Sequence, residues 1–257
     1  MAFDSIWLGL LVAAAFAGFV DAVAGGGGLI QVPALFAGLP QQSPATLFGT
    51  NKLASIFGTL NAARRYLREV EMNWAIAVPV AAAAFLFSFA GAAVVAWLPK
   101  EVVRPLVLGL LVAVAVYTWM KPDFGQQQRA AHIQGKRVLP VALLAGALLG
   151  FYDGFFGPGA GSFMIFAFVR LFGMDFLHAS ATAKIVNAAT NAGAILLFGP
   201  SGHMLWALGF GMAACNIVGA QLGARMAIRH GSGFVRAVFL VMTTLLIAKI
   251  GWDTLSA

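Results

Sequence analysis

The stretch GFVDAVAGGGGLIQVPALFAGLPQQSPATLFGTNKLASIFGTLN, residues 18–61, decides the fold of this chain because its pattern occurs twice. A shift of 132 positions places Asp21 on Asp153 and Lys52 on Lys184 without a gap. Self-similarity at a long fixed period indicates a duplicated architecture. In a membrane protein, interrupted hydrophobic segments at matching positions in two halves point to a transport site.

The composition indicates a chain that is mostly solvated by lipid. Of its 257 residues, 61% are hydrophobic and 10% are charged, and the mean hydropathy is +0.88. Several apolar runs approach the roughly 20 residues that cross a hydrocarbon core of about 30 Å. A net charge of +7 could suggest nucleic acid. In a membrane protein, however, basic residues mark cytoplasmic loops, so we expect the lipid bilayer and no nucleic acid as a partner.

Ten apolar segments, five in each half, predict an all-α integral membrane protein of about ten helices. They lie at about 5–24, 29–39, 44–63, 74–98, 102–120, 138–156, 160–173, 178–199, 204–224 and 233–252. The sequence therefore predicts a first membrane repeat at 1–120, a polar cytoplasmic linker at 121–137 and a second membrane repeat at 138–257.

The positions of the basic residues predict the orientation of the halves. If every segment crosses, four basic clusters fall on one side, which is then cytoplasmic. They are Arg64, Arg65 and Arg68; Lys121, Arg129, Lys136 and Arg137; Arg170; and Arg225, Arg229 and Arg236. An odd number of crossings inverts the second repeat, and both termini then lie on the periplasmic side of a cell inner membrane. Re-entrant second and seventh segments would instead make the halves parallel and scatter the charges.

The two shortest apolar segments follow glycine clusters and predict broken helices. The segment at 29–39 is too short to cross the core as a helix. Glycine lets backbone approach a ligand closely, and a helix start presents free N–H groups to an anion. The alternative to a binding role is structural, since small residues also allow helices to pack closely in a membrane. The candidate site glycines are Gly25, Gly26, Gly27 and Gly28 in one half, and Gly157, Gly159 and Gly161 in the other.

Two lysines inside apolar runs are the sharper candidates for substrate binding. A charged side chain there costs several kcal/mol unless it faces a cavity or a partner. Helical spacing places further polar residues on the same face as each lysine. These stripes are Lys52, Ser55 and Thr59, and Lys184, Asn187 and Asn191, with Thr50, Asn51 and Thr182 as weaker additions. The alternative is snorkelling, in which each lysine extends to a membrane face.

Asp21 and Asp153 are the matching acids, each at the end of a span before its glycine cluster. They could neutralise the lysines, carry a coupling proton or cap a helix turn. Enzyme and metal signals are weak by comparison. The single cysteine excludes cysteine-rich metal sites, no histidine pair has metal-ligand spacing, and neither a nucleophile elbow nor a Walker motif occurs. We therefore expect no enzyme, metal or cofactor.

These motifs resemble the TauE/SafE family of membrane transporters, also called the sulfite exporter family. The resemblance is carried by GFVDAVAGGGG and FGTNKLAS in the first half, and by GFYDGFFGPGAG and SATAKIVNAATN in the second. It covers nearly the whole chain and implies transport of sulfite, organosulfur anions or small carboxylates. The second glycine cluster, Gly-Pro-Gly-Ala-Gly, differs from the first, so the two half-sites are not equivalent.

The sequence thus predicts a secondary transporter that moves a small anion by alternating access. Lys52 and Lys184 would hold a sulfur oxyanion or small carboxylate, and Asp21 and Asp153 would couple it to a gradient, with H⁺ as the candidate ion. The main alternative is a cation or proton channel or exchanger organised on the two aspartates.

Overall fold

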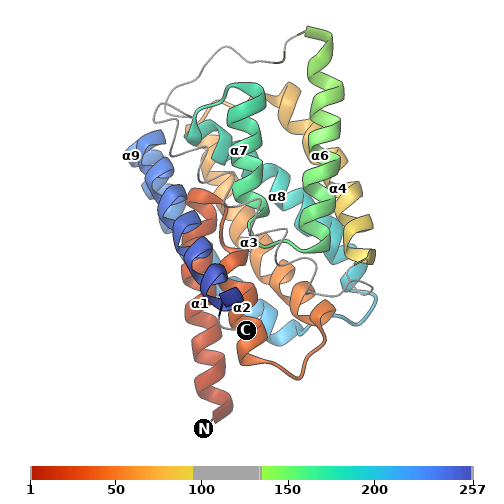
Figure 1. The fold of residues 1–257 in the computed structure, drawn as a ribbon, viewed down its shortest axis with the longest axis vertical. Helices are drawn as coiled ribbons and strands as arrows, with labels where there is room; N and C mark the ends of the chain where they lie inside the picture. Colours follow the sequence, from red (N-terminus) through yellow and green to blue (C-terminus); the bar gives the residue numbers. More distant parts are fainter. Residues whose placement is uncertain (1, 95–132, 134, 256–257) are drawn as a thin grey trace.

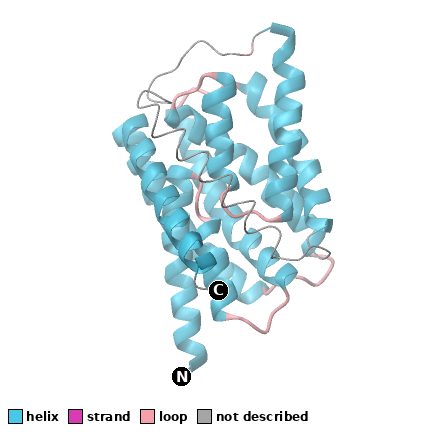
Figure 2. Ribbon diagram, viewed as in Figure 1, coloured by secondary structure: helices cyan, strands magenta, loops and turns pink. Residues whose placement is uncertain are grey.

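The computed structural model describes residues 2–94, 133 and 135–255, and every regular element in these ranges is a helix (Figure 2). The elements are α1 (Ala2–Ala24), α2 (Gly28–Gly38), α3 (Pro44–Glu69), α4 (Trp74–Val94), the 3-10 turn η1 (Gly135–Arg137), α6 (Val138–Phe155), α7 (Ala160–Phe172), α8 (Phe176–Phe198) and α9 (Trp206–Leu255). The predicted all-α class is confirmed. The predicted helix at 102–120 and most of the linker at 121–137 lie outside the described residues.

The helices of the two halves correspond in order. By the shift found in the sequence, α1, α2 and α3 match α6, α7 and α8, and α4 matches the first part of α9. Gly231, with φ 71° and ψ −166°, interrupts α9 and separates the two segments predicted there. In Figure 1, α1 begins at the lower end of the molecule and α6 at the upper end. The first helices of the halves therefore run in opposite directions, as inverted repeats require.

Local capping explains where two of the central helices begin. The Ser43 side chain accepts a hydrogen bond from the Thr46 N–H at 3.2 Å, and Pro44 occupies the first position of α3. The carboxylate of Asp175 accepts from the His178 N–H at 2.9 Å and so starts α8. Each cap satisfies a backbone donor that would otherwise lack a partner inside the molecule.

Each long helix packs mainly against a helix of the other half: α1 against α9, α6 against α4, α3 against α9 and α8 against α4. Small residues permit this close approach. A Cβ added at Gly219 would lie 1.8 Å from the Ala15 carbonyl oxygen, and one at Gly154 would lie 2.0 Å from that of Ser88. In lipid, such backbone-to-backbone packing is what draws helices together. The helices of 2–94 and 138–255 therefore interlock.

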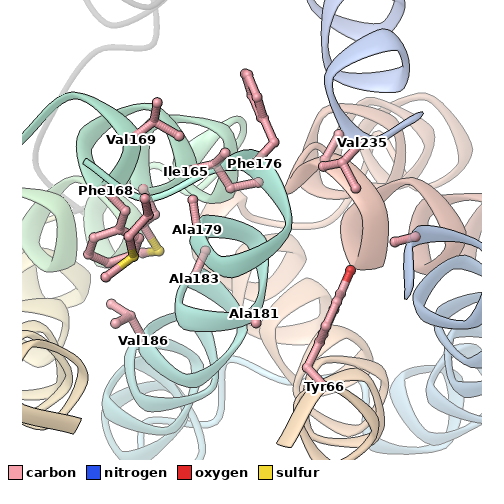
Figure 3. Close-up of a cluster of buried hydrophobic side chains, with 14 of the residues drawn as sticks. Tyr66, Ile165, Phe168, Val169, Phe176, Ala179, Ala181, Ala183, Val186 and Val235 are labelled. Carbon is pink, nitrogen blue, oxygen red and sulfur yellow. The ribbon is translucent and has the colours of Figure 1, made fainter. Parts of the chain in front are cut away.

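The apolar residues divide between a packed interior and an outer surface. The largest buried cluster surrounds α7 and α8 and includes Phe168, Phe176 and Val186 (Figure 3). Leucines at the outside, such as Leu86 and Leu148, are exposed. Five described segments are long and apolar enough to cross a membrane: Ser5–Ala24, Trp74–Val94, Gly135–Phe155, Phe176–Phe198 and Trp206–Val241. These features together describe a multi-pass membrane protein.

Candidate functional site

The two glycine clusters meet inside the molecule, where the short helices α2 and α7 begin. Gly25 has φ +74°, and a Cβ added to it would lie 2.3 Å from the Gly161 carbonyl carbon. The reverse is also true, because a Cβ on Gly161 would lie 2.5 Å from the Gly25 carbonyl oxygen. Gly28 lies against Pro158, its Cβ position being 3.3 Å from the proline Cα. Glycine is required here because two backbones from opposite halves touch.

The two predicted lysines form ion pairs with the two predicted aspartates, and each pair crosses between the halves. Lys52 Nζ lies 2.6 Å from Asp153 Oδ1, and Lys184 Nζ lies 2.8 Å from Asp21 Oδ2. The lysine side chains are 4% and 0% exposed. Snorkelling was the wrong alternative, because neither ammonium extends to the surface. Each half therefore neutralises the buried charge of the other, as a charge in an apolar interior requires.

The Lys184–Asp21 pair belongs to a dense hydrogen-bonded cap on the end of α1. Lys184 Nζ donates both to the carboxylate and to the backbone carbonyl of Asp21. The carbonyls of the last helical residues also receive side-chain hydroxyls. Tyr66 donates to Ala22 at 2.9 Å, Ser180 to Val23 at 2.9 Å and Ser162 to Ala24 at 2.9 Å. These donors satisfy carbonyls that a helix end leaves free.

The Lys52–Asp153 pair has sparser surroundings. Asp153 is 2% exposed, yet its Oδ2 atom has no hydrogen-bond partner among the described residues. Asn51, next to Lys52 in sequence, likewise has a buried side-chain oxygen without a partner there. Gly157 adjoins the pair with φ +87°, and a Cβ on it would lie 3.4 Å from both Lys52 Nζ and Asp153 Oδ1. A buried polar atom without a hydrogen-bond partner lowers the stability of the fold. The two oxygens of Asn51 and Asp153 therefore remain able to accept hydrogen bonds from a ligand.

The other predicted polar residues divide into two groups. Thr59, Asn187 and Asn191 are buried, and Ser55 is half-buried, on the helices that carry the lysines. The two threonines bond elsewhere: Thr50 Oγ1 donates to the Thr46 carbonyl at 2.7 Å, and Thr182 Oγ1 donates to the His178 carbonyl at 2.9 Å. The lysines are therefore not the hydrogen-bonding partners of these hydroxyls.

A cavity of about 270 Å³ opens where the α3–α4 and α7–α8 connections meet. It is lined by Glu71, Met72, Asn73, Phe172, Gly173, Met174, His178 and Thr182. Of the predicted binding residues only Thr182 lines it.

The corresponding positions at the other end of the molecule are closed by direct contacts. There the Leu205 N–H donates to Thr50 Oγ1 at 3.0 Å, and Thr46 Oγ1 lies 3.4 Å from His203 Nδ1. A Cβ on Gly49 would lie 2.1 Å from the His203 carbonyl oxygen. The repeat-related ends of the molecule therefore differ: one is hollowed and the other is packed shut.

Asp175 joins the hollowed end to α9. Its carboxylate accepts hydrogen bonds from His178 and from the Ser232 hydroxyl, the latter at 2.8 Å. Burial alone would raise the pKa of Asp175, but the hydrogen bonds from His178 and Ser232 and the charge of His178 outweigh it and lower the pKa. Asp175 thus remains ionised at neutral pH while it caps α8 and holds the region next to the Gly231 break.

Sequence reasoning missed two sets of functional candidates. One is the set of hydroxyls that bond the end of α1, from Tyr66, Ser162 and Ser180. The two serines lie among small and apolar residues and Tyr66 lies between arginines, so neither context singles them out. The other is a buried amide pair in which Asn216 Nδ2 donates to Gln31 Oε1 at 3.1 Å. Gln31 is 0% exposed and joins α2 to α9. Its signal was a lone glutamine in a short apolar segment.

The fold and these buried, reciprocal ion pairs define the class of protein: a multi-pass α-helical membrane protein whose charged centre is built from two related halves. Comparison with known proteins identifies the family. The family model described as "Sulfite exporter TauE/SafE" matches residues 10–250, so the chain belongs to the TauE/SafE family.

Curated relatives cover almost the whole chain. It is 37% identical over 245 residues to the "Probable membrane transporter protein YfcA" of Escherichia coli K12. That alignment covers 95% of this chain and 89% of the relative. It is 38% identical over 242 residues to a "Probable membrane transporter protein" of Haemophilus influenzae, covering 92% and 91%. No solved structure matches the chain. The family and these names support a membrane transporter.

Proposed function

We propose that this protein is a secondary transporter that moves a small anion, sulfite or an organosulfonate, across the cell inner membrane by alternating access. The observation that carries the proposal is the pair of reciprocal ion pairs, Lys52–Asp153 and Lys184–Asp21, at the meeting point of the halves. Buried charges of this kind mark ion and substrate pathways in membrane proteins. The family description, "Sulfite exporter TauE/SafE", suggests the substrate class.

The glycine turns support an anion as substrate. Helices α2 and α7 both begin next to the contact between Gly25 and Gly161. The free N–H groups and the helix dipole at a helix N-terminus attract negative charge. Together with two lysine ammoniums, they give the centre its capacity for an oxyanion. The aspartates match the cations in number, so an anion can bind only where a lysine is released from its carboxylate.

The difference between the two ends supports alternating access. One end carries the cavity at Thr182 and His178, and the repeat-related end is closed by Thr50 and His203. In transporters with inverted repeats, exchanging the conformations of the halves exchanges the open and closed ends. The hollowed end contains the connections that follow the basic residues of α3 and α7, and it is the cytoplasmic end in the predicted orientation.

The test is uptake of sulfite and of methanesulfonate into proteoliposomes. Lys52→Met should abolish flux of both anions while thermal unfolding stays cooperative. Lys136→Met is the matched control, because Lys136 is exposed and the same charge is removed. The proposal fails if wild-type protein moves neither anion but carries a voltage-driven current, which is the behaviour of a cation or proton channel. It fails equally if Lys52→Met and Lys136→Met give the same flux as wild type.

A further inference from the structure

The two ion pairs are related by the repeat but have different surroundings, and we infer that they have different roles. Lys184–Asp21 is a fixed cap on α1. Lys52–Asp153 is the pair that opens, with Asp153 carrying a proton that crosses together with a monovalent anion on Lys52. This inference rests on the proposed function and assigns the coupling ion and its carrier within the same site.

The Lys184–Asp21 pair is bound into the structure at several points. Lys184 also donates to the Asp21 backbone carbonyl, which in addition accepts the Gly25 N–H at 2.9 Å. Ser180 and Tyr66 hold the next carbonyls of α1. A cation at a helix C-terminus also interacts favourably with the helix dipole. Opening this pair would break the bond from Lys184 to the Asp21 carbonyl together with the ion pair, so it suits a structural role.

The Lys52–Asp153 pair lacks the equivalent supports because the repeat has apolar residues in their place. The shift of 132 positions places Ser162 on Ile30 and Ser180 on Phe48. The same shift places Tyr66 on Phe198. None of these apolar side chains can donate a hydrogen bond to the end of α6. The pair can therefore separate without breaking a network.

Asp153 also has a free position for a proton. Its Oδ1 atom is bound to Lys52, and its buried Oδ2 atom has no partner among the described residues. A protonated carboxyl donates a hydrogen bond through its O–H, whereas a carboxylate can only accept. Because the group is 2% exposed, transfer of a proton to Oδ2 removes a buried negative charge without further desolvation.

Among the residues that the structure describes, few other charges bear on Asp153. α4 has no titratable side chain, and Arg170 lies in the last turn of α7, away from its glycine end. On α8, Lys184 is bound to Asp21, and His178 lies in the first turn beside Asp175. On α6 itself the other titratable group is Tyr152, which donates to the Pro158 carbonyl. The remaining titratable side chains of α3 lie in its last two turns: Arg64, Arg65, Tyr66, Arg68 and Glu69. Within the described part of the chain, Lys52 is therefore the cation that pairs with Asp153.

The charge balance sets the stoichiometry. When the pair is closed, the ammonium and the carboxylate cancel. When a proton binds Asp153, the site is left with the single positive charge of Lys52, and one monovalent anion restores neutrality. Exposing a binding site to an apolar environment during the conformational change costs far less free energy when the site carries no net charge. Release of the anion and then of the proton on the other side closes the pair again.

Infrared spectroscopy tests the assignment of the proton without any substrate. A pH titration of wild-type protein in lipid should show the carbonyl stretch of a buried protonated carboxyl. Asp153→Asn should remove this band, and Asp21→Asn should leave it in place. If Asp21→Asn fails to fold, the neutral pair Asp21→Asn with Lys184→Met replaces it, since removing both charges leaves no unpaired ion. A band that survives Asp153→Asn, or that disappears with Asp21, overturns the assignment.

Transport then tests the coupling. Methanesulfonate is a strong-acid anion with one charge, so proton uptake reported by a pH dye inside the vesicles comes from the protein. Wild type should take up one proton with each anion, and Asp153→Asn should lose the anion-dependent proton signal. Unchanged coupling in Asp153→Asn overturns the inference but leaves transport intact. Absence of flux of both methanesulfonate and sulfite in wild type instead defeats the proposed function, and the infrared result still decides which aspartate takes the proton.

Discussion

The contact between the glycine clusters can be tested with one methyl group. In Gly161→Ala, the new Cβ would lie 2.5 Å from the Gly25 carbonyl oxygen and 2.6 Å from the Gly25 Cα. Carbon atoms in proteins rest at about 3.5–4.0 Å. The backbones at the starts of α2 and α7 must therefore separate by about 1 Å, and no flexible side chain is available to move instead.

The cost of this separation follows from the packing of the centre. Forcing an extra methyl into a well-packed interior costs about 1–3 kcal/mol. For a chain of this size, that corresponds to a fall in Tm of roughly 2–12 °C. Gly157 lies four residues before Gly161 and adjoins the Lys52–Asp153 pair, so the displacement should also lower anion flux.

Thermal unfolding in detergent, followed by tryptophan fluorescence, measures the shift. Gly9→Ala is the matched control, since Gly9 lies within α1 and a Cβ there meets nothing within 4 Å. Alanine is the better helix former by about 1 kcal/mol, so this control should be neutral or slightly stabilising. Equal Tm values for Gly161→Ala and Gly9→Ala would refute the close contact between the halves.

Three further changes test other parts of the structure in the same unfolding assay. Tyr66→Phe removes the hydroxyl bonded to the Ala22 carbonyl and should destabilise by about 1–3 kcal/mol, whereas an unchanged Tm contradicts the cap on α1. Asp175→Ala removes the N-cap of α8 at His178 and should cost about 0.5–2 kcal/mol at neutral pH. Because the folded pKa of Asp175 lies below its ordinary 3.8, its stabilisation is present above that value and lost as the pH falls through the folded pKa. The difference from wild type should therefore shrink in strong acid, and a constant difference contradicts it. Gly231→Ala places a side chain at φ 71° and ψ −166°, a region that is essentially restricted to glycine, and should cost about 1–3 kcal/mol through backbone strain alone, since open space surrounds it. An unchanged Tm would show that the break in α9 is not fixed.

The helices themselves were largely predictable, because apolar length and glycine or proline punctuation are local properties. The short helix predicted at 29–39 is observed at Gly28–Gly38, and that predicted at 160–173 at Ala160–Phe172. The third helix continues past its predicted end at 63 to Glu69, since its basic last turns are good helix formers. The length of the apolar run was a poor guide there because charged residues extend helices beyond the lipid.

The candidate site was predictable in its residue types but not in its bonds. Lys52 and Asp21 lie in the same half and are close in sequence, yet each is paired with a residue of the other half. The hydroxyl of Tyr66 could not be assigned from the sequence, since its partner is a backbone carbonyl of a distant helix. Such contacts depend on how helices cross, which no local pattern encodes.

By itself the sequence determined the membrane class, the duplication and the identity of the two lysines and two aspartates, because hydropathy and repeat spacing are carried residue by residue. Only the tertiary structure decided that the pairs exchange partners between halves and that one end of the molecule is hollowed while the other is closed. It also separated a heavily capped pair at Lys184 from a sparsely supported one at Lys52. The physical reason is that the free energy of a buried charge depends on its neighbours in space, and these come from opposite halves of the chain.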